Sequence, residues 1–185
     1  GHVGYALHFD GNSWRQVAMR PGEYFLSVSG LSPSDVWAVS HSSVSRYDGS
    51  RWISTSAPPD SLFTRVFALS SNAIYVGSFS GNVYRFDGST WRAMGNGGRY
   101  TRSLWARSTS EVYAAFDSKG VLRFNGTGWE STNSPLNVND LWGDATSLYA
   151  VGRDGFYRYD GSAWHQLSRD TLNSVHGWDA RNVFA

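Results

Sequence analysis

The stretch Phe86-Asp87-Gly88-Ser89-Thr90-Trp91 is one of five copies of a six-residue phrase: an aromatic residue, Asp, Gly, a small polar residue, any residue, and Trp. The other copies, one with Asn in place of Asp, lie at residues 9–14, 47–52, 124–129 and 159–164. Asp-Gly between two strand-like runs is a strong hairpin signal, because Gly takes the positive φ of a tight turn and Asp bonds nearby backbone donors. The phrase therefore predicts five β-hairpins of one design.

A second phrase, apolar and then aromatic, lies between these copies at residues 31–38, 69–76, 111–114, 147–150 and 182–185. A short apolar segment precedes each, at residues 25–28, 63–66, 103–104, 138–141 and 172–175. Each repeat thus reads as four strands, expected in the second copy at about 24–31, 35–40, 43–47 and 51–56. Apolar side chains on both parities of the second strand indicate a sheet buried on both faces. Four-stranded units of this length are typical of β-propellers.

The spacing of the repeats predicts a closed ring. Successive motif Trp residues are 38, 39, 38 and 35 residues apart, and the interval from Trp164 round to Trp14 is 35, so that the five intervals add up to 185. The sequence begins and ends inside one repeat, whose halves complete each other. We therefore expect residues 1–185 to form a single all-β domain. It would be a five-bladed β-propeller with four antiparallel strands per blade, closed by a blade shared between the N- and C-termini. Such a blade hides edge strands that otherwise promote aggregation.

Composition excludes several classes of protein. Sixteen Lys and Arg against fifteen Asp and Glu do not favour nucleic acid or an anionic membrane. There is no cysteine, and no apolar run near the ~18 residues of a membrane span. No HExxH, GxSxG, phosphate-binding or calcium-loop motif is present, and the five His residues are dispersed. We therefore expect neither an enzyme nor a metal site or cofactor, and no membrane insertion.

Two phrases of the second copy carry a resemblance to a known kind of repeat. Ser32-Pro33-Ser34-Asp35-Val36-Trp37-Ala38-Val39, followed by Arg46-Tyr47-Asp48-Gly49-Ser50-Arg51-Trp52, resembles the propeller repeats of large extracellular bacterial proteins, notably those of myxobacteria. The resemblance covers all five copies and implies a fold, with no catalytic signature. It implies an extracellular or cell-surface location, with any export signal outside this sequence. The five-bladed architecture is similar to that of tachylectin-type lectins, whose sugar-binding residues find no position-by-position match here.

Positions at which the copies differ are the best candidates for ligand contact. The motif Trp occurs in every copy, which indicates blade packing. The end of the first strand differs between copies, and innermost strands line the channel of a propeller. Trp178 has no aromatic counterpart in the other copies. The candidate ligand-binding residues are therefore Trp105, Trp142, His176, Phe67 and Trp178. The alternative for the strand-end residues is that they fill the core of the ring.

These observations favour a non-enzymatic, monomeric binding module. A glycan is the preferred ligand, bound at several related sites, because sugar faces stack on aromatic rings and multivalency raises weak affinities. One alternative is a protein-interaction scaffold, and another is an engineered or reconstructed propeller without a natural ligand. A hydrolase or lyase ranks last, since it would need carboxylates of perturbed pKa gathered around a pocket.

Overall fold

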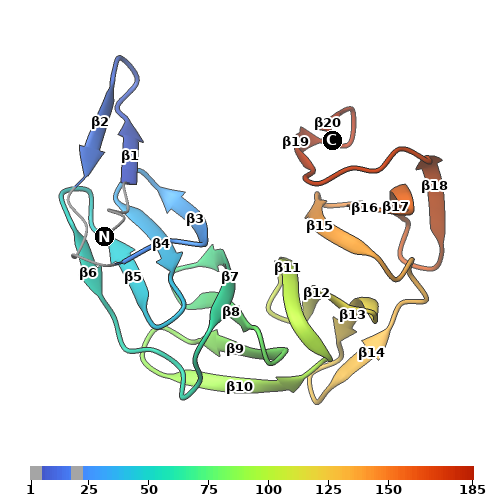
Figure 1. Cartoon of the computed structure of the whole chain (residues 1–185), viewed down its shortest axis with the longest axis horizontal. Coiled ribbons are helices and arrows are strands. Elements are labelled where there is room, and N and C mark those ends of the chain that lie inside the picture. Colours follow the sequence, from blue (N-terminus) through green and yellow to red (C-terminus); the bar gives the residue numbers. More distant parts are fainter. Residues whose placement is uncertain (1–5, 18–22) are drawn as a thin grey trace.

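A computed structural model describes residues 6–17 and 23–185 of the chain. It contains twenty β-strands and no helix within these residues. The strands form four four-stranded sheets and two two-stranded hairpins. Figure 1 shows the sheets following one another around an arc, with one hairpin at each end.

The four complete sheets each consist of four consecutive strands. The first sheet contains β3 (Ser27–Ser32), β4 (Asp35–Val39), β5 (Val44–Tyr47) and β6 (Trp52–Ser54). The second contains β7 (Phe63–Ser70), β8 (Ala73–Ser78), β9 (Asn82–Phe86) and β10 (Trp91–Asn96). The third contains β11 (Arg99–Ser108), β12 (Glu111–Asp117), β13 (Gly120–Phe124) and β14 (Trp129–Ser131). The fourth contains β15 (Val138–Gly143), β16 (Leu148–Gly152), β17 (Gly155–Tyr159) and β18 (Trp164–Ser168).

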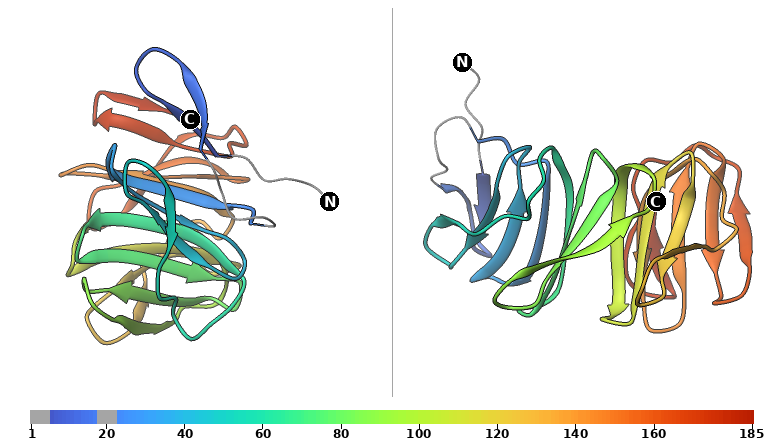
Figure 2. Two further views of the ribbon diagram at one scale, coloured as in Figure 1. Left: turned by 90° about the vertical axis from the view of Figure 1, so that its left-hand side faces the viewer. Right: turned by 90° about the horizontal axis from the view of Figure 1, so that it is seen from below.

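Each sheet is an antiparallel meander, and the four share one register. The second and third strands align Val36 with Tyr47 in the first sheet, and the equivalent pairs recur in the other sheets: Ile74 with Phe86, Val112 with Phe124, and Leu148 with Tyr159. The first strand of every four-stranded sheet faces the middle of the arc (Figure 1), and Figure 2 shows the same series of sheets from two further sides. The prediction of four antiparallel strands per repeat is confirmed for these four copies, with strand bounds in the first sheet within a few residues of those expected.

The fifth repeat is divided between the two hairpins. The N-terminal hairpin contains β1 (Ala6–Phe9) and β2 (Trp14–Val17), and the C-terminal hairpin contains β19 (His176–Asp179) and β20 (Asn182–Phe184). They are separate sheets on opposite sides of the open part of the arc (Figure 1). The expected four-stranded junction blade is therefore not formed here, and the closed ring is not seen. Each hairpin pairs only within itself, which leaves one edge of β1 and one edge of β20 unpaired.

The hydrophobic core lies between sheets and not within one. Tyr75 and Val83 of the second sheet pack with Leu104, Val112 and Phe116 of the third. Similar layers join the first sheet to the second, the third to the fourth, and the fourth to the C-terminal hairpin. Burial of the second strand on both faces, expected from its two apolar parities, is confirmed most completely in β8, where all six residues are buried.

The motif turns have the expected chemistry. Gly49 has a φ of 97°, a conformation that only Gly adopts without cost. One carboxylate oxygen of Asp48 accepts hydrogen bonds from the backbone N–H of Ser50 (2.8 Å) and of Arg51 (2.9 Å). The pKa of Asp48 is lowered to about 2, most by the hydrogen bond from the Ser50 hydroxyl and then by those from the two N–H groups. Asn125 holds the equivalent turn with its side-chain oxygen, so an amide serves there as well as a carboxylate.

Candidate binding site at the centre and rim

The innermost strands surround a cavity of about 660 Å³ at the centre of the arc. Its lining includes four of the five candidate ligand-binding residues: Phe67, Trp105, Trp142 and His176. They come from β7, β11, β15 and β19, at one equivalent position of each strand. The fold thus brings together residues that are about 35–40 positions apart in the sequence. Trp178 does not line this cavity and borders a shallow hollow beside Asp144 and Arg181.

Two of the candidate Trp residues pack against glycines of the following sheet. Trp105 is only 6% exposed, and a Cβ placed on Gly143 would lie 2.7 Å from its Cζ2 atom. Trp142 approaches Gly177 in the same way, with 2.9 Å from the hypothetical Cβ to Cη2. A glycine is needed at each position because a side chain there would overlap the indole. Trp105 therefore fills the space between two sheets, and little of its surface is left for a ligand.

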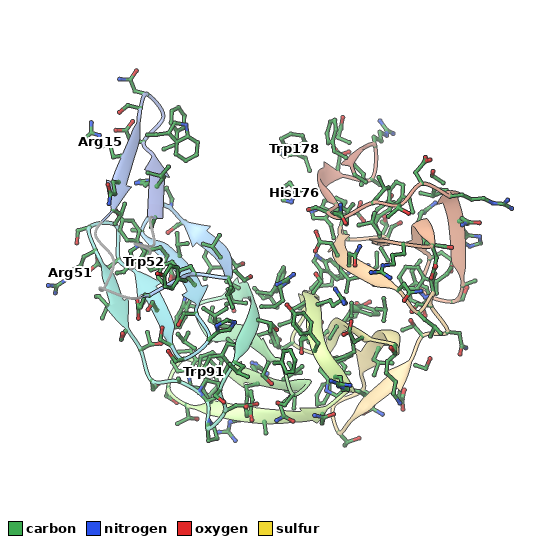
Figure 3. All side chains as sticks on the ribbon, in the orientation of Figure 1. Arg15, Arg51, Trp52, Trp91, His176 and Trp178 are labelled. Carbon is green, nitrogen blue, oxygen red and sulfur yellow. The ribbon has the colours of Figure 1, made fainter. Side chains whose placement is uncertain are left out.

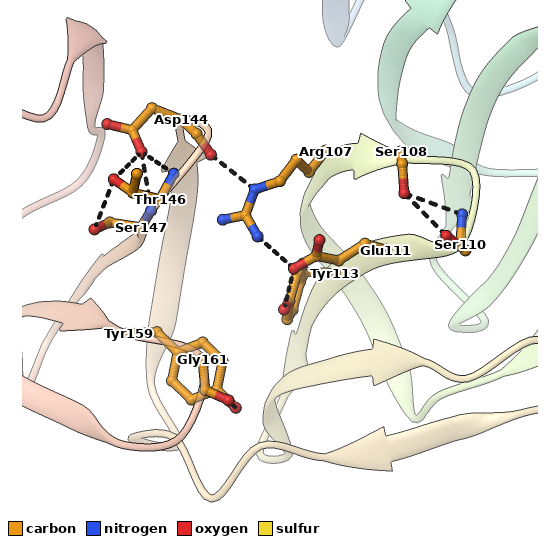
Figure 4. Close-up of polar contacts among 10 residues, drawn as sticks. All are labelled: Arg107, Ser108, Ser110, Glu111, Tyr113, Asp144, Thr146, Ser147, Tyr159 and Gly161. Carbon is orange, nitrogen blue, oxygen red and sulfur yellow. Dashed lines mark hydrogen bonds and ion pairs between the residues drawn. The ribbon is translucent and has the colours of Figure 1, made fainter.

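Arg107, next to Trp105, belongs to a polar network (Figure 4). The Arg107 guanidinium lies 5.3 Å from the Trp105 ring centre. Its Nε donates to the Asp144 carbonyl (2.9 Å) and its Nη1 to Glu111 (2.5 Å). The Tyr113 hydroxyl donates to the same Glu111 oxygen (2.9 Å), and burial together with that hydrogen bond raises the pKa of Tyr113 to about 12. This network ties the third sheet to the fourth.

His176 and Trp178 are exposed on the C-terminal hairpin. Figure 3 shows both on the side of β19 that faces the open part of the arc. Trp178 is 77% exposed and meets Phe184 edge-on at 5.7 Å between ring centres. The rings of His176 and Trp142 meet edge-on, with 6.3 Å between their centres. The hairpin β19–β20 is a separate sheet at one end of the arc, and both side chains are exposed there.

A belt of hydrogen bonds joins the innermost strands across the central cavity wall. In each bond a side-chain oxygen of one repeat accepts a hydrogen bond from a backbone N–H at the inner edge of the next repeat. This N–H points away from its own sheet and forms no backbone hydrogen bond with the strands there. The bonds run from Val66 N to Ser27 Oγ (3.2 Å), from Leu141 N to Ser103 Oγ (3.1 Å) and from Val175 N to Asp140 Oδ2 (3.1 Å). We call this series the belt.

Two of the motif Trp residues, Trp91 and Trp164, are hydrogen-bonded to a neighbouring repeat. Trp91 Nε1 donates to the Ser56 carbonyl (2.8 Å), and Trp164 Nε1 donates to Thr132 Oγ1 (3.1 Å), in each case in the segment after the preceding sheet. Each also packs against the aromatic residue of its own motif, as Trp164 does on Tyr159 at 4.9 Å. This is the packing role expected from their presence in every copy. Trp14, in the N-terminal hairpin, is exposed instead.

A second hollow, of about 310 Å³, lies where the first three sheets connect, and the sequence analysis missed it. We call its lining residues Leu26, His41, Leu62, Phe79 and Tyr100 the rim patch. Leu26, Leu62 and Phe79 are each more than 40% exposed, and Arg65 lines both this hollow and the central cavity. The available signal was Phe79, a large apolar residue in the turn Ser78-Phe79-Ser80-Gly81, where polar residues are usual.

The backbone of the rim patch is strained at two equivalent positions. Leu62 has a φ of 57° and Tyr100 a φ of 41°, values that cost a non-glycine residue about 1–2 kcal/mol. Each is held by a backbone hydrogen bond to the turn before it, from Leu62 N to the His41 carbonyl (2.5 Å) and from Tyr100 N to the Phe79 carbonyl (2.9 Å). Phe79 and Tyr100 meet edge-on at 5.4 Å. The connections thus hold large apolar side chains at the surface.

The described residues contain neither a cluster of metal-ligating side chains nor a helix that could span a membrane. Within residues 6–17 and 23–185, no three His, Asp or Glu side chains lie together as metal ligands would. The same residues contain no helix of the length and apolarity needed to cross a membrane.

Comparison with known proteins identifies the fold class. No protein-family model matches the sequence, and no curated protein does. Solved structures do match. YCF48 bound to D1 peptide is 20% identical with a TM-score of 0.63, over 90% of this chain and 62% of that one. The nidogen/laminin complex is 14% identical with a TM-score of 0.74, over 92% and 74%. The computationally designed Ika8 protein is 10% identical with a TM-score of 0.67, over 89% and 57%.

The neighbours are β-propellers, and this chain shares their architecture of repeated four-stranded antiparallel sheets. The chain spans less than two thirds of YCF48 and of Ika8. At these identities the likeness concerns the fold alone. The comparisons give no support to glycan binding, and they do not test the myxobacterial resemblance of the repeat phrases.

Proposed function

We propose that this protein is a non-enzymatic, extracellular or cell-surface module that closes into a monomeric five-bladed propeller and binds a peptide segment of a partner protein. The rim patch carries the functional part of the proposal. Leu62 lies in the connection between the first and second sheets and Phe79 in the turn between β8 and β9, so the open ends of the arc do not account for the exposure of these two side chains. Contiguous exposed apolar surface of this kind usually marks an interaction site.

Exposed residues at the two ends of the arc support closure. Phe184 is 62% exposed, whereas its repeat equivalents Trp37, Tyr75, Tyr113 and Tyr149 are at most 4% exposed. Val28, at the other end, is 63% exposed, whereas its equivalents Val66, Leu104, Leu141 and Val175 are at most 6% exposed. A hollow of about 280 Å³ with a mostly apolar lining, including Val28, Val36 and Tyr47, lies between the first sheet and the N-terminal hairpin. Insertion of the C-terminal hairpin there would cover the apolar surface of both ends.

The repeat equivalences also give the contacts of the closed state. Ser103 Oγ donates to Asp140 and accepts the Leu141 N–H, and Ser174 Oγ already donates to Asp140 (3.0 Å). Ser174 would then accept the Val28 N–H and complete the belt. In the same way, Trp142 lies over Gly177, and His176 would lie over Gly30. A bulky residue would again meet a glycine.

A disulfide tests closure and its register. Val183 stands at the position of Val36 and Phe9 at that of Tyr47, which are paired in the first sheet. Because the chain has no cysteine, the double variant Val183→Cys/Phe9→Cys isolates this pair. We expect an intramolecular disulfide under mild oxidation, since directly opposed strand residues lie within disulfide range. Val183→Cys/Ala6→Cys, three residues out of register, is the control that should remain reduced. Equal cross-linking of both variants, or cross-linking only between molecules, would contradict the closed monomer.

Peptide recognition suits the chemistry of the rim patch. An apolar hollow bordered by a few polar groups orients a ligand while burying its side chains. The solved structures named above include a propeller with a bound peptide and one in complex with laminin. Those partners belong to the other proteins, and they support the proposal through the shared fold only. Glycan binding by the central aromatic residues stays a prediction, with His176 and Trp178 as its most exposed candidates.

Selection from random peptide libraries tests the function. We expect enriched peptides whose binding is lost in Phe79→Ser and kept in Leu136→Ser, an exposed leucine that lies outside the rim patch. A glycan array run in parallel separates the hypotheses. Sugar binding that is lost in His176→Ala or Trp178→Ala, with no peptide enriched, would overturn the proposal in favour of a lectin.

A further inference from the structure

The belt has one exception, and the exception is a cation. Ser27, Ser103 and Asp140 supply belt oxygens to the next strand. The equivalent residue of β7 is Arg65. A guanidinium has donors and no acceptor, so the N–H of Leu104, at the repeat position of Val66 and Leu141, receives no belt oxygen from it. The second sheet therefore presents donors at the point where the other sheets present an acceptor.

The Arg65 guanidinium has N–H donors that remain available to a ligand. Its Nη1 donates to the neighbouring Thr64 carbonyl (2.8 Å). Among the described residues, no carboxylate lies within ion-pair distance of it. Asp140 is the acidic residue that lines the same cavity, and both of its oxygens already accept hydrogen bonds from Ser103, Leu141, Ser174 and Val175. Arg65 is thus a cation of the central cavity without an ion-pair partner among the described residues.

Arg65 also connects the two hollows. It lines the central cavity together with Phe67 and Trp105, and it lines the rim hollow together with Leu62 and Phe79. A ligand group held by Arg65 would lie between the central cavity and the apolar rim patch. The ligand that fits has a negative group next to an apolar side chain.

We propose that Arg65, with the Leu104 N–H, binds a carboxylate of the partner peptide, while an adjacent apolar side chain of that peptide occupies the rim patch. This inference rests on the proposed peptide-binding function and names the chemistry of its ligand. A guanidinium suits a carboxylate because it offers parallel N–H donors to both oxygens. The carboxylate is either the C-terminus of the peptide or an Asp or Glu side chain.

The test uses Arg65→Ser, which restores the residue type that Ser27 and Ser103 place in the belt. The variant should therefore fold at least as stably as the parent protein. Peptides enriched from random libraries are synthesised and titrated by fluorescence anisotropy against the parent, Arg65→Ser and Phe79→Ser. Arg51→Ser, which removes an exposed arginine from a motif turn, controls for net charge. We expect Arg65→Ser to weaken binding by about tenfold or more, the usual scale for a charge-assisted hydrogen bond, and Arg51→Ser to leave it unchanged.

Modified versions of the enriched peptides show whether the bound carboxylate is the C-terminus or a side chain. Loss of binding on C-terminal amidation assigns the terminal carboxylate, and loss on Glu→Gln or Asp→Asn in the peptide assigns a side chain. Either result supports the inference. Peptides that depend on Phe79 but bind Arg65→Ser as tightly as the parent would overturn it and leave the proposed function standing. If the folded protein enriches no peptide, both are overturned.

Discussion

Phe184→Ala measures whether the ends of the arc meet. In the structure described here Phe184 is 62% exposed, whereas its equivalents in the complete sheets are nearly buried. Closure would therefore remove about 60% of its side chain from water. For an aromatic side chain of about 200 Å² this is ~120 Å², worth about 3 kcal/mol at ~25 cal/mol per Å². We expect the truncation to lower the free energy of unfolding by about 2–3 kcal/mol, because Ala retains a small part of that burial.

Urea unfolding followed by tryptophan fluorescence gives this free energy. Leu136→Ala is the matched control, since Leu136 is 57% exposed and lies away from the two ends of the arc. Substitution of such a surface residue changes stability by only about 0.5 kcal/mol. Repeating the titration at two protein concentrations tests whether a second copy covers Phe184. We expect one midpoint at both concentrations.

Two results would refute this reasoning. If Phe184→Ala and Leu136→Ala have the same small effect, Phe184 stays in water and the ring is open. If the effect of Phe184→Ala is large but the midpoint rises with protein concentration, the ends of different molecules pair, and the closed monomer is wrong.

Three further predictions concern the interior and the turns. Gly143→Ala should destabilise the protein by about 1–3 kcal/mol in urea unfolding, because the new methyl group overlaps Trp105; Gly128→Ala, where no atom lies within 4 Å, should be near neutral, and equal effects would contradict the packing. Ser103→Ala should lower the free energy of unfolding by about 1 kcal/mol, because the Leu141 N–H loses one of its two acceptors and Asp140 loses a donor, and an unchanged urea midpoint would contradict that role. The pKa of Asp48 is lowered to about 2, so its stabilising effect is present above its ordinary pKa of 3.8 and is lost as pH falls toward 2; Asp48→Asn should flatten this loss, and an unchanged pH dependence of the urea midpoint would contradict it.

The turns and strands could be predicted because their causes are local. An Asp-Gly pair specifies its turn through the φ of Gly49 and the two N–H groups bonded to Asp48, all within four residues. The two apolar parities of the second strand specify that both faces are covered. The repeat length then leaves a ring of four-stranded sheets as the natural packing.

The sequence also indicated the strand position at which the copies differ, and Phe67, Trp105, Trp142 and His176, which occupy it, do line one cavity. It could not give their exposure. Trp105 is buried because a glycine of another repeat, Gly143, leaves room for its indole, and that match spans 38 positions of the chain.

What the sequence alone determined is the repeated sheet: its turns, its strand order and its two buried faces. What only the tertiary structure decided is how unlike residues of different repeats meet: the rim patch beside the first three sheets, Arg65 between two hollows, and the exposure of Phe184 at an unpaired edge. The physical reason is the distance along the chain over which each kind of interaction acts. Backbone dihedral angles and strand parity act within a few residues, whereas burial and charge compensation depend on the side chains that the next sheet supplies.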